Sequence, residues 1–415
     1  MKLLWLKTEL LHPIDKGGRI RTYHMLRELK REHHITYLTL DDGDAASDAV
    51  DRAEEYCHEL IRIPLQTQLK RSVGFYLELL RNLGSKLPYA IWKYRSAAMR
   101  RVIADAARKS EADVIVCDFL APAVNVPTRE DLSGRVVLFQ HNVEATIWER
   151  HTQVASNPLT KVYFREQWRR MRAFERAQCR RFDHVVAVSR GDMEVFETEY
   201  GVTNVSEIPT GVDIEYFRPR GGVRPESYDL VFTGSMDWLP NEDAIVFFTE
   251  AILPGIRELV PGVTLTVVGR NPSPRVLALA RHDPAVRITG SVPDVRPYIE
   301  RAAVFIVPLR IGSGTRLKIY EAMAMEKAIV STSIGAEGLP VTDGEDIILA
   351  DTPQTFASSV IQLLTDAQRA ERIGQRAASL VRAEFGWDRV ADKFATICDG
   401  VVASRPESVP AWSSR

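Results

Sequence analysis

The sequence has few of the features that mark a secreted, membrane-spanning or zinc-binding protein. It has four cysteines, Cys57, Cys117, Cys179 and Cys398, which are far apart and form no CxxC pair. This spacing argues against a disulfide framework and against a zinc site. The first apolar run ends at Leu6, and no later run approaches the roughly 20 residues that cross a bilayer. We therefore expect reduced thiols in a cytoplasmic chain without a transmembrane helix.

The chain also has almost no net charge. Its 54 Lys and Arg residues and 55 Asp and Glu residues give a formal charge of -1 over 415 residues. This balance excludes a globally basic nucleic-acid binder and an acidic disordered chain. Apolar residues make up 45% of the sequence, which is sufficient for substantial cores. The length, roughly three times that of a ~150-residue domain, predicts two domains or one large domain with insertions.

Short apolar runs alternate with longer amphipathic stretches, as in parallel sheets whose strands are joined by helices. We therefore predict an α/β fold. Strands are expected at Lys2–Leu6, Ile35–Leu40, Val114–Cys117, Val136–Phe139, His184–Val188, Asp229–Thr233, Leu265–Val268, Val304–Pro308 and Ala328–Ser331. Helices are expected at Arg19–Arg31, Leu159–Arg181, Asn241–Leu259, Asp294–Ala302 and Leu317–Met325.

A break in this pattern separates two halves. Residues 218–228 contain two prolines and a glycine pair, which predicts a linker. The predicted domains are 1–217 and 229–385, each a doubly wound Rossmann-like sheet, facing one central cleft. A helix at 386–400 is expected to pack back on the first domain, and 401–415 is expected to be a flexible tail. Ligands bind such sheets at the carboxyl ends of the strands.

Glycines at strand-to-helix turns mark candidate anion sites. Gly17 and Gly18 precede the first predicted helix, so backbone N–H groups there can approach a phosphate or a polar sugar. A purely steric role for the pair is the alternative. Gly234 follows a strand in the second half and is a further ligand-binding candidate, whereas capping of the next helix accounts for Asn241.

The glycine-containing loop after the strand Val304–Pro308 is the most informative segment. It leads into a helix whose first turn carries Arg316 and Lys318. Cations at a helix N-terminus oppose the helix dipole, so a bound anion would explain them. Glu321, one turn further on, is placed to bind ribose hydroxyls. The alternative is a solvated helix start in which one cation pairs with Glu321.

These motifs together resemble the family 4 retaining glycosyltransferases (group 1 glycosyltransferases) of the GT-B architecture, and the resemblance extends over nearly the whole chain. Each motif is common alone, but their order in two halves is specific. They are Pro13 with Gly17-Gly18, His141-Asn142-Val143-Glu144, Val188-Ser189, Ile208-Pro209-Thr210-Gly211-Val212-Asp213 with Phe217-Arg218-Pro219, Val268-Gly269, Thr289-Gly290-Ser291-Val292-Pro293-Asp294-Val295, Lys318 with Glu321-Ala322-Met323-Ala324, and Ser331-Thr332 with Gly335-Ala336-Glu337-Gly338.

The resemblance implies transfer of a sugar from a nucleotide-diphosphate sugar, with retention, to a glycan or lipid-linked acceptor, without a metal or other cofactor. It implies a role in surface polysaccharide or glycolipid synthesis. It also implies that the second domain binds the donor, with Glu321 on the ribose, and that the first domain mainly holds the acceptor. The chain departs from the family pattern at Ser313, where the first Glu of a paired-glutamate motif is expected, and at Gly234–Asp237, which lacks the usual Arg and Lys. We infer that Arg316 and Lys318 neutralise the diphosphate instead.

The site residues follow from these arguments. His141 lies after the strand Val136–Phe139, where a neutral imidazole can bind a sugar hydroxyl, and a structural role is its alternative. We assign catalysis to His141, Arg316 and Lys318, donor binding to Gly17, Gly18, Gly234, Gly314, Thr315, Leu317 and Glu321, and no residue to a metal. Two other functions stay open, namely an inactive nucleotide-sugar-binding scaffold and a nucleotide-sugar epimerase on the same architecture.

Charge is concentrated locally in the first half. Residues 62–109 contain 11 cations and two acids, a net charge of +9, interleaved with aromatic and aliphatic residues. A second basic stretch spans Lys161–Arg181. This mixture is typical of contact with an anionic membrane, which would be the inner face of the cell membrane. The alternative is ordinary domain surface, compensated by the neighbouring acidic stretch that contains Asp42 and Asp44. No nucleic-acid recognition module is present.

Overall fold

The computed structural model describes residues 1–14, 16–43, 45–66, 68, 72–109, 111–128, 132, 134–154, 157–221, 228–311 and 317–404. These residues form two compact units: Met1–Pro209 with the residues from Val390 on, and Thr210–Arg389. The division falls before the linker predicted at 218–228, because the turn after Pro209 packs on the second unit. There, Val212 N donates to Phe385 O at 2.8 Å, and the Trp387 ring lies against Gly211. Residues 222–227 of the predicted linker lie outside the described part.

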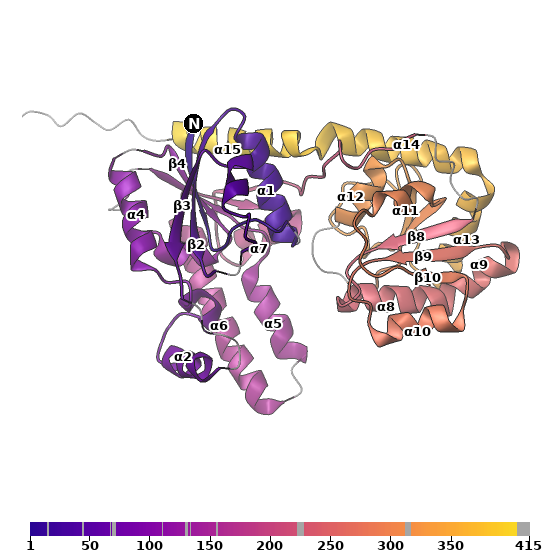
Figure 1. Cartoon of the computed structure of the whole chain (residues 1–415), viewed down its shortest axis with the longest axis horizontal. Helices are drawn as coiled ribbons and strands as arrows, with labels where there is room; N and C mark the ends of the chain where they lie inside the picture. The colour runs from indigo at the N-terminus through magenta and orange to yellow at the C-terminus, as the bar shows by residue number, and fades with distance from the viewer. Residues whose placement is uncertain are drawn as a thin grey trace, which may run out of the picture. The chain divides into compact units, whose positions relative to one another are not determined.

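The first unit is built on a parallel sheet (Figure 1), and the strand order is β3-β2-β1-β4-β5-β6-β7. The strands are β1 Lys2–Lys7, β2 His34–Asp41, β3 Glu59–Pro64, β4 Val114–Asp118, β5 Arg135–Phe139, β6 His184–Ala187 and β7 Val205–Glu207. The helices are α1 Gly17–Leu29, α2 Val73–Leu83, α3 Tyr89–Trp92, α4 Ala97–Arg108, α5 Glu144–Val154, α6 Pro158–Arg181, α7 Arg190–Thr198 and, from Val390, α15 Trp387–Ala403. The central strands are almost wholly apolar and buried, as expected for a sheet covered on both faces.

Large aromatic side chains fill one part of this core. Trp5 of β1 packs against Phe139 of β5 in an edge-on arrangement, with ring centroids 6.1 Å apart. Phe394 of α15 completes the cluster, 5.5 Å from Trp5 and 5.3 Å from Phe139. The last helix therefore contributes a fully buried ring to the first unit.

The second unit has a parallel sheet with the order β10-β9-β8-β11-β12-β13. Its strands are β8 Asp229–Thr233, β9 Thr264–Val268, β10 Val286–Ile288, β11 Val304–Val307, β12 Ala328–Ser331 and β13 Ile348–Leu349. Its helices are α8 Leu239–Phe247, α9 Leu253–Leu259, α10 Pro274–His282, α11 Arg296–Arg301, α12 Leu317–Ala324, α13 Pro353–Thr365 and α14 Ala367–Glu384. A π-helical turn at Phe248–Ile252 interrupts the helix predicted over Asn241–Leu259.

Both sheets confirm the predicted α/β, doubly wound architecture. In each one the chain winds outward to one edge, then returns to the centre and winds to the other edge. The reversal falls between β1 and β4 in the first unit and between β8 and β11 in the second. The carboxyl ends of strands at such a reversal form the crevice where open α/β sheets bind ligands. These two positions are therefore the expected ligand sites of the two units.

Two further findings bear on the sequence predictions. None of the helices in the described ranges is long and apolar enough to cross a membrane. All four cysteines are free thiols with buried side chains.

Candidate active site

Polar side chains lie at or just after the carboxyl ends of three strands of the first unit, next to the reversal point. Lys7 is the last residue of β1, Asp118 is the last residue of β4, and His141 follows β5 by two residues. Because Leu6 pairs with Cys117 across β1 and β4, and Asp118 pairs with Phe139 across β4 and β5, the three polar residues are adjacent.

Asp118 is the centre of this group. Its Oδ2 accepts hydrogen bonds from Lys7 Nζ at 2.9 Å, Trp5 Nε1 at 2.9 Å and Thr22 Oγ1 at 2.6 Å. Lys7 Nζ also donates to Thr22 Oγ1 at 2.7 Å. Both charged side chains are almost completely buried, with 2% of Lys7 and none of Asp118 exposed. Helix α1, which carries Thr22, is therefore tied to the ends of β1 and β4.

Burial and charge act in opposite directions on these groups. Burial by itself would raise the pKa of Asp118, but Lys7 and His141 outweigh it and hold that pKa well below its usual range. Burial lowers the pKa of the Lys7 ammonium, and Asp118 restores it only in part. The pair is consequently an ammonium and a carboxylate that each need the other to remain charged inside the protein.

His141 lies against the same carboxylate. Its Nε2 is 2.8 Å from Asp118 Oδ1, and 2% of its side chain is exposed. Its ring stacks on Phe119, with the centroids 3.8 Å apart and an interplanar angle of 24°. Burial lowers the pKa of His141 to about 3, so the imidazole is neutral at pH 7. The ring is enclosed by Asp118 and Phe119. The catalytic role of His141 stays a prediction.

The two glycines at the start of α1 have different surroundings. A Cβ at Gly18 would lie 2.7 Å from Phe119 Cζ, so glycine is needed there for the Phe119 ring to lie over His141. Phe119 itself has a φ of 71°, a strained value for an aromatic residue. Gly18 therefore has a steric role, and its donor-binding role stays a prediction. A Cβ at Gly17 would meet nothing within 4 Å, and its donor-binding role stays a prediction.

Glu175 of α6 fixes the loop that carries His141. Its carboxylate accepts from Gln140 Nε2 at 2.9 Å and from the backbone N–H groups of Glu144 at 2.8 Å and Ala145 at 3.0 Å. Tyr200 OH donates a fourth hydrogen bond at 2.9 Å. Burial raises the pKa of Glu175 to about 7, and the two backbone N–H groups and the Tyr200 hydroxyl oppose the rise. The carboxylate thereby caps the first turn of α5, immediately after His141.

In the second unit, Lys318 reaches across to the turn after β8. Its Nζ donates to Asn241 Oδ1 at 2.7 Å and lies 4.1 Å from the centre of the Phe232 ring. Asn241 Nδ2 in turn donates to Ser235 O at 2.9 Å. A Cβ at Gly234 would lie 2.8 Å from both Lys318 Nζ and Asn241 Nδ2. The structure therefore brings Gly234 and Lys318 together, although they are 84 positions apart in the sequence.

Glu321 lies on the same helix, α12, one turn after Lys318. It is half-buried. Burial raises its pKa to about 7, and the nearby Lys318 ammonium opposes the rise. Leu317 is the first residue of α12. Gly314, Thr315 and Arg316, which the sequence assigned to the donor site, lie outside the described residues, as does Ser313.

Lys7, Asp118 and Glu175 are functional candidates that the structure adds to those predicted from the sequence. For Lys7 and Asp118 a signal was available, because a charged residue that directly ends a buried apolar strand has to find a partner at that edge of the sheet. Glu175 offered no such signal, since it stands among the arginines of α6 in a stretch interpreted as basic surface.

Two doubly wound units in one chain are the architecture of the GT-B class of glycosyltransferases. The family model described as Glycosyltransferase Family 4 matches residues 16–216, and the model described as Glycosyl transferases group 1 matches residues 227–366. Together they cover most of the chain. The chain belongs to the family 4, group 1 glycosyltransferases and is a transferase enzyme.

The chain is also similar to individual proteins and to solved structures. An uncharacterized 44.6 kDa protein in the cps region of Klebsiella pneumoniae is 20% identical, covering 94% of this chain and 97% of its own. A GDP-mannose-dependent alpha-(1-6)-phosphatidylinositol monomannoside mannosyltransferase of Mycobacterium tuberculosis is 25% identical, covering 66% of this chain and 80% of its own. The crystal structure of Anabaena HepE in complex with UDP-glucose has a TM-score of 0.64 at 13% identity, covering 96% of this chain and all of HepE, and so shares the fold.

Proposed function

We propose that the enzyme transfers a sugar from a nucleotide-diphosphate sugar to a glycan or lipid-linked acceptor, with retention at the anomeric carbon and without a metal or other cofactor. The biological setting proposed is surface polysaccharide or glycolipid synthesis, at the cytoplasmic face of an anionic membrane. The second unit binds the donor, and the first unit mainly holds the acceptor.

The ammonium of Lys318 at the turn after β8 carries this proposal. Departure of a nucleoside diphosphate leaves negative charge on the β-phosphate, and a fixed cation that meets this charge lowers the barrier. Asn241 fixes Lys318 Nζ in position at 2.7 Å, and the missing side chain at Gly234 leaves the backbone open beside it. Arg316, two residues earlier in the sequence, is proposed to supply a second cation. Glu321 is proposed to accept hydrogen bonds from the ribose hydroxyls.

The names of the relatives support the class of donor and acceptor. The mycobacterial mannosyltransferase depends on GDP-mannose, and HepE binds UDP-glucose. Both donors are sugars linked to a nucleoside diphosphate. The mycobacterial enzyme acts on a phosphatidylinositol monomannoside, which is a lipid-linked acceptor.

His141 is proposed to contribute as a neutral hydrogen-bonding group rather than as a general base. An imidazole with a pKa of about 3 does not hold a proton taken from an acceptor hydroxyl at pH 7. Deprotonation of the acceptor is therefore assigned to a phosphate oxygen of the donor, on the same face of the sugar.

Calorimetry with UDP, GDP and their sugars tests donor binding directly. A ligand that binds the folded chain also raises its melting temperature, which gives an independent measurement. The variant Lys318→Met is expected to weaken binding of the matching nucleoside diphosphate and to lower turnover about 100-fold. Lys393→Met, on the exposed face of α15, removes the same charge elsewhere and is the control. Equal affinity and turnover in the two variants would refute the role of Lys318.

Product analysis separates the remaining alternatives. With donor and acceptor together, NMR of the anomeric proton is expected to report the donor's configuration in the product, and EDTA is expected to leave turnover unchanged. With the donor alone, slow hydrolysis is expected. Conversion of the donor into another nucleotide sugar would instead identify an epimerase, and an inverted product would refute retention.

A further inference from the structure

Helix α2 exposes a stripe of large apolar side chains. Five large apolar side chains of this helix are between 49% and 78% exposed, namely Val73, Tyr76, Leu77, Leu80 and Leu83. Positions 73, 76, 77, 80 and 83 follow helical spacing and form a single stripe. A surface helix normally buries such a stripe, so an exposed one marks an interaction surface.

The inward face of α2 is held largely by polar contacts. Glu78 accepts a hydrogen bond from Tyr89 OH at 2.8 Å, and Asn82 Nδ2 donates to Leu87 O at 3.0 Å. Phe75 packs edge-on against the Tyr89 ring, with the centroids 5.7 Å apart. These contacts determine which side of α2 faces the protein.

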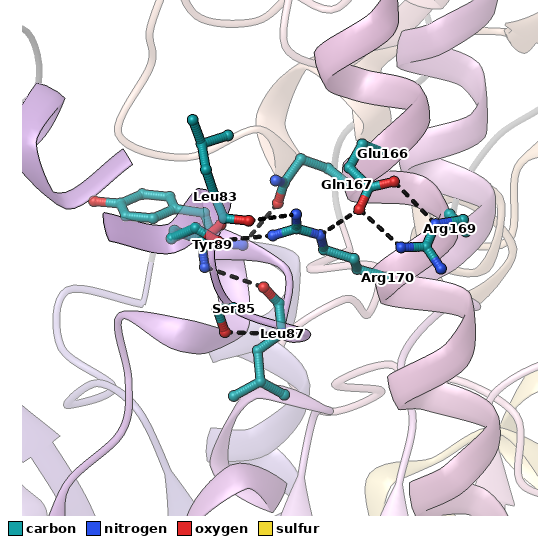
Figure 2. Close-up of polar contacts among 9 residues, drawn as sticks. Leu83, Ser85, Leu87, Tyr89, Glu166, Gln167, Arg169 and Arg170 are labelled. Carbon is teal, nitrogen blue, oxygen red and sulfur yellow. Dashed lines mark hydrogen bonds and ion pairs between the residues drawn. The ribbon is translucent and has the colours of Figure 1, made fainter. Parts of the chain in front are cut away.

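Helix α6 locks this orientation (Figure 2). Arg170 donates to the carbonyl oxygens of Asn82 at 2.8 Å and Leu83 at 3.1 Å, which are at the C-terminal end of α2. Its Nε donates to Glu166 at 2.7 Å, and the buried Gln167 accepts from Tyr89 N at 2.7 Å. A guanidinium that satisfies the last carbonyls of α2 also complements the negative end of its dipole. The apolar stripe is therefore kept facing outward by specific contacts.

The start of α6 carries further exposed apolar side chains and lies at the same end of the first unit as α2 (Figure 1). Leu159 and Val162 are 82% and 69% exposed. They alternate with the exposed cations Lys161 and Arg165, and residues 157–165 contain no acid. Apolar side chains beside cations are the composition of surfaces that bind anionic lipid headgroups.

Charge complementarity selects the occupant. The residues of this surface, 72–88 and 157–165, contain four cations and one acid. This acid, Glu78, bonds to Tyr89 on the inward face. Arg81 and Lys86 are exposed next to the stripe. An excess of cations favours an anionic bilayer over a neutral protein surface. Each cation near such a bilayer adds electrostatic attraction, which falls off within a Debye length.

We propose that α2 and the first turn of α6 form the docking surface by which this enzyme binds an anionic phospholipid bilayer. The apolar stripe of α2, with Leu159 and Val162, enters the boundary between headgroups and acyl chains. Arg81, Lys86 and Lys161 contact lipid phosphates. This inference rests on the proposed function only in that it assigns a surface to the membrane contact proposed there.

Vesicle flotation with the full chain tests the docking surface. We expect binding to vesicles of phosphatidylglycerol and phosphatidylcholine in equal parts, weaker binding at high salt, and little binding to phosphatidylcholine alone. Replacing two exposed side chains, in the double variant Leu77→Ser/Leu80→Ser, is expected to weaken binding at least tenfold. Leu259→Ser is the matched control, because Leu259 is also an exposed helical leucine, 73% exposed, in the second unit.

The outcomes separate this inference from the proposed function. Donor affinity, measured on the same samples, is expected to be equal in the double variant and the wild type. A wild type that binds donor but no vesicles, or a double variant that floats like the wild type, would refute the docking surface alone. A chain that floats but binds no donor would refute the proposed function alone. Sedimentation equilibrium without lipid tests the remaining occupant, since a wild-type dimer that the double variant dissociates would assign the stripe to a second copy of the chain.

Discussion

The buried pair between Lys7 and Asp118 gives a quantitative prediction. The variant Asp118→Asn keeps the size of the side chain and leaves an amide oxygen for Trp5 and Thr22, but it removes the negative charge. The Lys7 ammonium, 2% exposed, is then left without its counterion. Removing one partner of a buried ion pair costs about 3–5 kcal/mol, because the other charge stays desolvated. We expect a loss of about 4 kcal/mol in the free energy of unfolding of the first unit.

Urea titration followed by far-UV circular dichroism measures this loss. The exposed pair of Asp105 with Arg108 supplies the control, and Asp105→Asn is expected to cost far less. The double variant Lys7→Met/Asp118→Asn removes both charges and is expected to be less destabilised than the sum of the two single variants. A cost below about 1 kcal/mol for Asp118→Asn, or a double variant equal to that sum, would refute the account of this pair.

Three further predictions concern the second unit and α15. Gly234→Ala is expected to displace Lys318 and lower turnover by about 10- to 100-fold in a kinetic assay, because the new Cβ would lie 2.8 Å from its Nζ; an unchanged rate would contradict the geometry. The raised pKa of Glu321 means that the folded unit holds a proton that the unfolded chain releases, so thermal stability should fall as pH rises from 4.5 to about 7, and Glu321→Gln should remove that part of the slope. Gly374→Ala places a Cβ 2.1 Å from a backbone oxygen and should destabilise by about 1–3 kcal/mol, whereas Gly400→Ala, with nothing within 4 Å, should stabilise by about 0.5–1 kcal/mol; urea midpoints that move in the same direction would contradict this.

The sequence predicted the central strands of both sheets and missed the edges. Every predicted strand is present with its ends within one residue of the prediction, as for β8 and β12. The four strands that were not predicted, β3, β7, β10 and β13, are the outermost strands of the two sheets. A central strand is buried on both faces and reads as an apolar run, whereas an edge strand is short or carries alternate polar residues, such as Arg62 in β3.

The candidate site was predictable where a local motif carries it. Gly234, Lys318 and Glu321 follow strand ends in the sequence, and this position was enough to select them. The contact of Lys318 with Asn241 was not predictable, because it joins the first turns of α12 and α8. Only the pairing of β8 with β11 brings these two helix starts together. Asn241 had been interpreted as a helix cap, but α8 begins at Leu239, and the amide bonds to Ser235 and Lys318 instead. Asp118 does carry a signal, as a charge that ends a buried strand, but its partners come from β1, α1 and the segment after β5, and the sequence does not identify them.

The discontinuous make-up of the first unit affects how the protein is made and how it can be divided. During translation, residues 1–209 emerge from the ribosome long before Phe394 is synthesised, and the Phe394 ring is the one that packs on Trp5 and Phe139. During that interval the nascent unit has an aromatic surface with no cover. A fragment that ends at Pro209 lacks α15, and its Trp5 and Phe139 rings therefore stay uncovered by Phe394. To obtain the first unit alone, α15 would have to be joined to Pro209 by a new linker.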